Sequence, residues 1–89
     1  MPTISMCYGI IVSMFFEIND KHHLPHVHVR HQGMKASFAI EDSRLLAAEI
    51  PVRQQRMVQV WIDLHQEQLM ADWELASNGE QPFRIDPLK

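Results

Sequence analysis

Histidines are concentrated in one short stretch of this chain. The segment KHHLPHVHVRH, residues 21–31, holds five of the six histidines. Imidazole nitrogens bind transition metals, and they exchange protons near neutral pH because an unperturbed histidine has a pKa of about 6.5. The segment therefore predicts one of three things: a metal site, a pair of acid/base groups, or a polar strand whose histidines hydrogen-bond to neighbours and water.

Strand alternation divides these histidines into two sets. In the segment HVHVRH, residues two apart share a face, so His26, His28 and Arg30 point one way and His31 points the other. The Cα atoms of His26 and His28 would be about 6.5 Å apart. Two imidazoles at that spacing suit acid/base catalysis at a phosphate, and Arg30 would contact the phosphate. The alternative for Arg30 is a surface position, paired with Glu41 or with nothing.

The loop before this strand offers a third group. His22, His23 and Asp20 can fold back toward the strand. Imidazoles that converge on one ion at about 2.0–2.1 Å form a typical site for a divalent transition metal such as zinc. The metal alternative therefore takes His22, His26 and His28 as ligands.

The elements that must position these residues follow from hydrophobic periodicity and turn residues. Alternating or β-branched runs indicate strands, and an uninterrupted run of helix formers before Asn78-Gly79 indicates a helical segment. We expect an α+β fold, in which an antiparallel β-meander of three to four strands packs one face against a C-terminal helical segment. The expected strands span residues 9–17, 26–32, 34–41 and 45–50, and the helical segment spans residues 52–77.

The helical segment carries a regular stripe of large side chains. Trp61, His65, Leu69 and Trp73 are each four residues apart, which places them along one side of a helix. The stripe predicts packing against the sheet, with His65 between apolar neighbours. The alternative is that His65 reaches the histidines of the second strand. The pattern also leaves open whether the segment is one helix or two with a break near His65, and whether residues 45–50 form a strand or a short helix.

Bulk properties limit the class of protein. The chain of 89 residues makes a single domain, residues 1–89, with little core to spare, so packing against a second copy as a homodimer or against a partner is expected. A net charge of −3 argues against sequence-blind nucleic-acid binding by a strongly basic surface. The single cysteine and the lack of a signal peptide or membrane span predict a cytoplasmic protein.

Several motifs together resemble a family of small bacterial proteins called domain of unknown function 4160. They are MPTIS..YGIIV.MFF at the start, H-x-x-P-H-V-H-V in the second strand, KA after the turn, and W...H...L...W in the helical segment. The family pattern is similar to His-x-Pro-Pro-His-Phe-His, and it marks His22, His26 and His28 in this chain. Leu24 replaces the first proline of the pattern and Val27 replaces its aromatic residue.

The resemblance implies a genetic setting as well as a site. Members are commonly encoded beside a second small family, domain of unknown function 2442, in arrangements that suggest a two-gene toxin–antitoxin module. The implied function is a component of such a module that binds a cognate small protein and uses the histidine site, with RNA cleavage as the chemistry if it is an enzyme. The alternatives are a non-catalytic protein-interaction module and a metal-binding protein that uses the same histidines.

Overall fold

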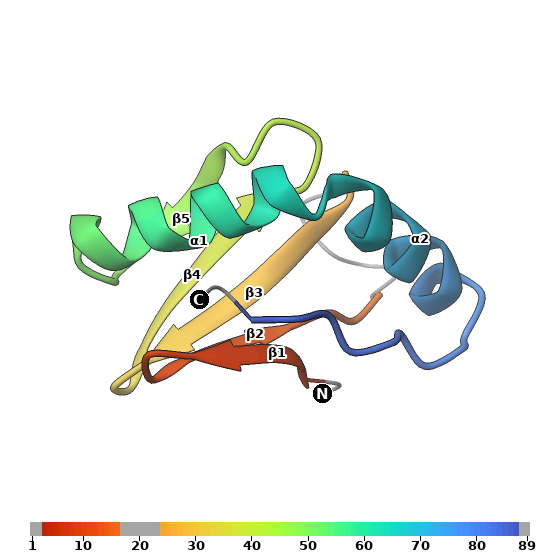
Figure 1. The fold of residues 1–89 in the computed structure, drawn as a ribbon, viewed down its shortest axis with the longest axis horizontal. Helices are drawn as coiled ribbons and strands as arrows, with labels where there is room; N and C mark the ends of the chain where they lie inside the picture. The colour runs from red at the N-terminus through yellow and green to blue at the C-terminus, as the bar shows by residue number, and fades with distance from the viewer. Residues whose placement is uncertain (1–2, 17–23, 88–89) are drawn as a thin grey trace.

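The computed structural model describes residues 3–16 and 24–87, and it has one antiparallel sheet with two helices (Figure 1). The elements in chain order are β1 (Thr3–Cys7), β2 (Ile10–Ser13), β3 (His26–His31), β4 (Met34–Ala39), β5 (Leu45–Ala48), α1 (Val52–Leu64) and α2 (Gln66–Ser77). Each strand pairs with its neighbours in the sequence, so the sheet order is β1-β2-β3-β4-β5. The predicted α+β class and the meander are confirmed, but the sheet has five strands instead of three to four.

The additional strand results from a tight turn near the N-terminus. Tyr8 and Gly9 have φ angles of 50° and 74°, the positive values that a two-residue type I′ hairpin requires. The strand expected at residues 9–17 is therefore shorter, Ile10–Ser13, and it pairs with β1 before it. A second turn of the same kind, Gln32-Gly33, joins β3 to β4 as predicted.

The helices cover one face of the sheet. Figure 1 shows α1 lying across this face and α2 beside the start of β3. The helical segment is two helices, because His65, with φ −124° and ψ 26°, separates α1 from α2. The side-chain amide of Gln66 donates to the carbonyl oxygens of Ile40 and Glu41, at 3.1 and 2.7 Å, and holds this corner against the end of β4.

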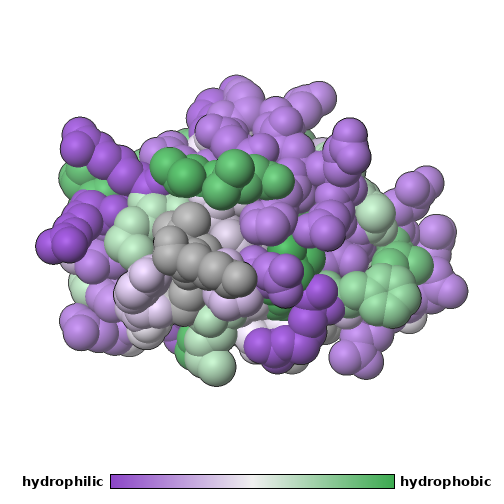
Figure 2. Space-filling model, viewed as in Figure 1, coloured by the Kyte–Doolittle hydropathy of each residue, from purple (hydrophilic) through white to green (hydrophobic). Residues whose placement is uncertain are grey.

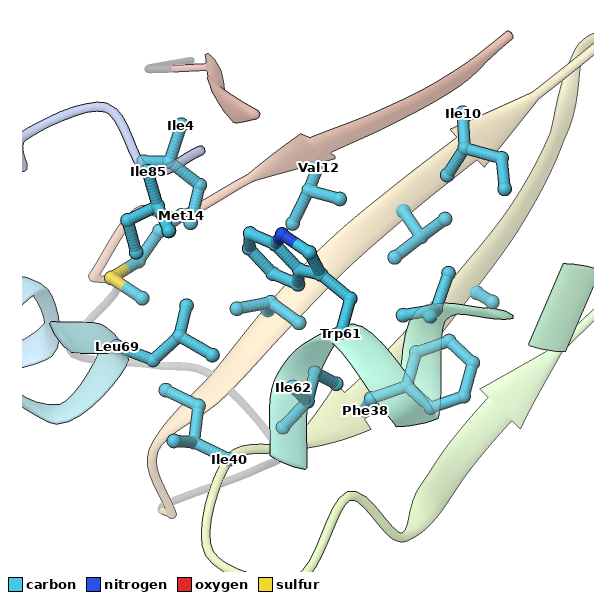
Figure 3. Close-up of a cluster of buried hydrophobic side chains, with 14 of the residues drawn as sticks. Ile4, Ile10, Val12, Met14, Phe38, Ile40, Trp61, Ile62, Leu69 and Ile85 are labelled. Carbon is cyan, nitrogen blue, oxygen red and sulfur yellow. The ribbon is translucent and has the colours of Figure 1, made fainter. Parts of the chain in front are cut away.

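One apolar core lies between the sheet and the helices (Figure 3). Trp61 and Ile62 of α1 and Leu69 of α2 point into it, which confirms the packing stripe predicted for the helical segment. His65 packs on the Trp61 ring at 5.4 Å between ring centroids, and its Nδ1 lies 3.0 Å from Oε1 of Gln68. These two contacts place His65 within the helical layer, between the apolar ring of Trp61 and the polar side chain of Gln68 rather than between apolar neighbours only.

The segment after α2 runs back along the sheet as an extended strap, residues 81–87. The Ile85 amide donates to the Ile4 carbonyl of β1 at 2.8 Å, and Trp61 Nε1 donates to the Asp86 carbonyl at 2.8 Å. The Phe83 amide donates to Oδ1 of Asp72 at 3.0 Å. The strap thus ties β1, α1 and α2 together through its backbone.

The surface over the helices is mostly polar. Figure 2 shows hydrophilic residues over most of this face, with separate apolar patches among them. Val60 and Leu64 of α1 are among the exposed apolar side chains. Within the part of the chain that the structure describes, no helix is both long enough and apolar enough to cross a membrane.

Candidate functional site

Strand β3 separates its side chains into an apolar and a polar face, as the alternation predicted. Val27 and Val29 are buried in the core under the helices. His28 and Arg30 lie on the opposite face, where His28 is half-buried and Arg30 is exposed. Arg30 is exposed on this face, whereas Trp73 of α2 packs on the face at its His26 end.

The two candidate histidines are joined in a chain of hydrogen bonds. His26 Nδ1 lies 2.8 Å from the Leu24 carbonyl oxygen, and His26 Nε2 lies 3.1 Å from His28 Nε2. The Ser37 hydroxyl of β4 lies 3.5 Å from His28 Nδ1. A carbonyl oxygen can only accept, so neutral His26 carries its proton on Nδ1 and presents a lone pair at Nε2.

That assignment also determines where the protons lie on His28 and Ser37. His28 donates from Nε2–H to His26, which leaves the lone pair of His28 on Nδ1 to accept from the Ser37 hydroxyl. Every donor in this series of hydrogen bonds therefore meets an acceptor. A positive charge that forms on His28 is stabilised by the Nε2 lone pair of His26, because the proton between the rings already points to it.

The two histidines differ in their access to solvent. His26 is 1% exposed and packs against the Trp73 ring of α2, with ring centroids 5.2 Å apart. His28 is half-buried, and the Phe15 ring stacks on it at 4.4 Å with an interplanar angle of 11°. His28 is therefore the more accessible of the two rings, and His26 is the more buried.

A hollow of about 310 Å³ lies beside His28. It is lined by residues of four strands and of the segment after β2: Thr3, Ile11, Ser13, Phe15, His28, Val29, Arg30, Lys35 and Ala36. No lining residue is acidic, and two of them are cationic. The volume lies within the range of small-ligand sites, about 300–1,000 Å³.

The two cations of the hollow face each other across the sheet. Arg30 of β3 and Lys35 of β4 are direct partners in the strand register. Neither forms an ion pair within the described chain, and Arg30 is exposed, so within the described residues it fits the alternative of a surface arginine paired with nothing. Like charges directly opposite each other destabilise a sheet. An anion between the two side chains would remove this repulsion.

The geometry of the histidine pair also suits a metal ion. Two nitrogens that bind one tetrahedral zinc at about 2.0–2.1 Å lie roughly 3.3 Å apart, and the two Nε2 atoms here are 3.1 Å apart. The third predicted ligand, His22, lies outside the described residues. Within residues 3–16 and 24–87, no three His, Cys, Asp or Glu side chains form a group that could hold a metal ion.

Of the other three histidines in the segment, the structure describes one, His31. His31 lies on the face opposite His28, as expected, where its Nδ1 contacts the Gly9 carbonyl oxygen at 3.2 Å. His23, like His22, falls outside the described residues.

Three residues of the site were not identified from the sequence. Lys35 could have been found by counting across the turn Gln32-Gly33, since a two-residue turn makes Arg30 and Lys35 partners. The same count places Ser37 opposite His28. The stacking of Phe15 had no such signal, because it depends on how the segment after β2 packs on β3.

One family comparison covers most of the chain. The model of a family described as a domain of unknown function (DUF4160) matches residues 9–74, which run from the turn before β2 into α2. No curated protein and no solved structure matches the chain significantly. The match includes β3 with both histidines and the cations of the hollow, and it covers more than half of the chain. The chain belongs to the DUF4160 family.

Proposed function

We propose that this protein is one component of a two-gene toxin–antitoxin-like pair and that it cleaves RNA at the His28 site. The observation that carries this proposal is the hydrogen-bonded chain from the Leu24 carbonyl through His26 and His28 to Ser37. It orients the His28 ring beside the cations of the hollow. A histidine held in this position, beside cations that can hold a phosphate, is a suitable general acid/base at a phosphodiester.

In the proposed reaction the RNA supplies its own nucleophile. His28 Nδ1 takes the proton of a ribose 2′-hydroxyl, and the 2′-oxygen attacks the adjacent phosphorus. The bond from phosphorus to the 5′-oxygen breaks, and the imidazolium of His28 returns its proton to that oxygen. Arg30 holds the phosphate, and His26 is a positioning residue that stabilises the imidazolium through its Nε2 atom.

The test is a ribonuclease assay on labelled RNA with protein purified without a histidine tag. His28→Ala should lower the rate by about 10²–10⁴-fold, the usual contribution of a general acid/base group. His65→Ala is the matched control, since His65 contacts Trp61 and Gln68 in the helical layer. DNA of the same sequence, which lacks the 2′-hydroxyl nucleophile, should resist cleavage. Equal rates for the wild type and His28→Ala would reject the proposal.

The separation of the two Nε2 atoms favours a second candidate function, metal binding by His26 and His28 with His22 as third ligand. Zinc or nickel should then raise the melting temperature of the wild type and leave that of His26→Ala with His28→Ala unchanged. Metal that restores RNA cleavage after chelation would mark the reaction as metal-assisted. A bound metal without any cleavage would favour the metal-binding protein.

The cognate partner is tested separately from the chemistry. If the pair acts as toxin and antitoxin, expression of the wild-type chain alone should slow growth, and co-expression of the neighbouring gene should restore it. His28→Ala should be harmless but should still bind the partner protein. Partner binding in a chain that cleaves no RNA would instead identify a non-catalytic interaction module.

A further inference from the structure

We infer that the hollow beside His28 takes single-stranded RNA, with one phosphate between Arg30 and Lys35 and one base against Phe15. That the ligand is RNA rests on the proposed function. The preference for a single strand, the phosphate contact and the base contact go beyond it. Arg30, Lys35, His28 and Phe15 line the same hollow.

The paired cations define the phosphate position. Directly opposite residues on an antiparallel pair have Cβ atoms about 4.5–5.5 Å apart, so one phosphate can contact both side chains. The guanidinium of Arg30 presents a planar set of donors that matches two phosphate oxygens, and the ammonium of Lys35 adds a point charge. Both side chains are exposed, and neither has an acidic partner within the described chain. Phosphate is the anion that RNA brings to this face.

The Phe15 ring defines the base position. One face of the ring is stacked on His28, and the half-buried side chain also borders the hollow. Aromatic side chains on an exposed sheet face bind unpaired bases by stacking, with about 1–3 kcal/mol per base. Because His28 covers one face of the ring, a base stacks on the other face, with the phenyl ring between the base and His28.

The same features disfavour a duplex. Paired bases are stacked inside a double helix and present no face to an aromatic ring, and double-stranded RNA is recognised over about 16 base pairs through many backbone contacts. This chain has a net charge of −3 and only two cations lining the hollow. One phosphate neutralised on a single strand predicts a slope of log K against log salt of about −0.7.

The experiment measures binding by fluorescence anisotropy with a short RNA that carries 2′-O-methyl groups and so cannot be cleaved. The single strand should bind more tightly than its duplex, with a salt slope of about −0.7 for the wild type and a slope near zero for the double variant Arg30→Ala with Lys35→Ala. Arg53→Ala is the matched control, since Arg53 is exposed on α1 and lines no part of the hollow; its slope should equal that of the wild type.

The base contact is tested with Phe15→Leu, which keeps an apolar side chain but removes the ring. The affinity for the single strand should fall by roughly 5- to 150-fold, the equivalent of the stacking energy. On an abasic strand the wild type and Phe15→Leu should bind equally. A thermal melt of each variant excludes unfolding as the cause of weaker binding.

The outcomes separate this inference from the proposed cleavage. Duplex binding as tight as single-strand binding, or a salt slope unchanged in Arg30→Ala with Lys35→Ala, would overturn the inference even if the wild type cleaves RNA. The expected binding pattern in a protein without ribonuclease activity would support the inference and reject the cleavage.

Discussion

The carboxyl group of Asp72 lies buried between α2 and the strap. Its Oδ1 accepts the Phe83 amide, whereas its Oδ2 has no hydrogen-bond partner among the described residues. Burial raises the pKa of Asp72 above its ordinary value of 3.8, and the hydrogen bond from the Phe83 amide opposes that shift without cancelling it. The charged form of this group therefore costs stability in the folded state.

Asp72→Asn should stabilise the protein at neutral pH, by an amount on the order of 1 kcal/mol. Between pH 3.8 and the raised pKa, the unfolded chain loses this proton before the folded chain does, so the wild type loses stability as pH rises. The asparagine keeps an oxygen for the Phe83 amide and carries no charge. Urea unfolding of both proteins should show their difference in unfolding free energy grow above pH 3.8 and then level off. A difference that shrinks as pH rises would contradict this account.

The residues of the site also differ in what the sequence reveals about them. The shared face of His26, His28 and Arg30 followed from alternation alone. Their unequal roles did not, because the burial of His26 depends on Trp73, which is distant in the sequence. Proton positions along the chain likewise depend on the Leu24 carbonyl, whose direction no residue pattern determines.

At the level of elements, the strap depends on contacts far apart in the sequence. Trp61 of α1 is buried in the core, yet its indole N–H reaches the Asp86 carbonyl. Of the two large apolar side chains that the structure describes in the strap, Ile85 is buried and Phe83 is 72% exposed.

Trp61→Phe should loosen the strap without unfolding the sheet. The variant loses one hydrogen bond and some packing, with a cost of about 1–3 kcal/mol. Trypsin cleavage after Arg84 reports the change, because the Ile85 amide at that bond is held by Ile4 in the wild type. Mass spectrometry should show faster cleavage after Arg84 and an unchanged rate after Arg56 in α1. Equal rates at Arg84 in both proteins would show that Trp61 does not secure the strap.

Sequence patterns predicted the elements best where local signals agreed. Strands β3 and β4 alternate cleanly around Gln32-Gly33, and both appeared near their expected positions. Strand β1 was missed because Tyr8 is an unusual residue in a two-residue turn, although Gly9 beside it is typical. The break at His65 lies among good helix formers, and the contacts of Gln66 with the end of β4 hold it in place.

The whole molecule has one apolar core, and its stability depends on a few buried side chains. A domain of this size is expected to have a free energy of unfolding of about 5–15 kcal/mol. Ile62 of α1 is 0% exposed and belongs to this core, whereas Val60 of the same helix is 51% exposed.

Ile62→Ala should therefore remove about 2–5 kcal/mol from the free energy of unfolding, because it leaves a cavity between α1 and the sheet. Val60→Ala should change it by less than about 0.5 kcal/mol, since that side chain is already in water. Urea unfolding monitored by circular dichroism measures both. Comparable losses in the two variants would show that α1 does not cover the core as described.

The strap makes the two edges of the sheet unlike. The Ile4 carbonyl on the outer side of β1 already accepts the Ile85 amide, whereas among the described residues no strand pairs with the outer side of β5, whose sequence is LLAA. A strand with a bare edge and no charged side chains invites pairing with another chain. With one such edge in the part of the chain that the structure describes, pairing between two β5 strands would give a closed two-fold dimer, which cannot extend into a fibre.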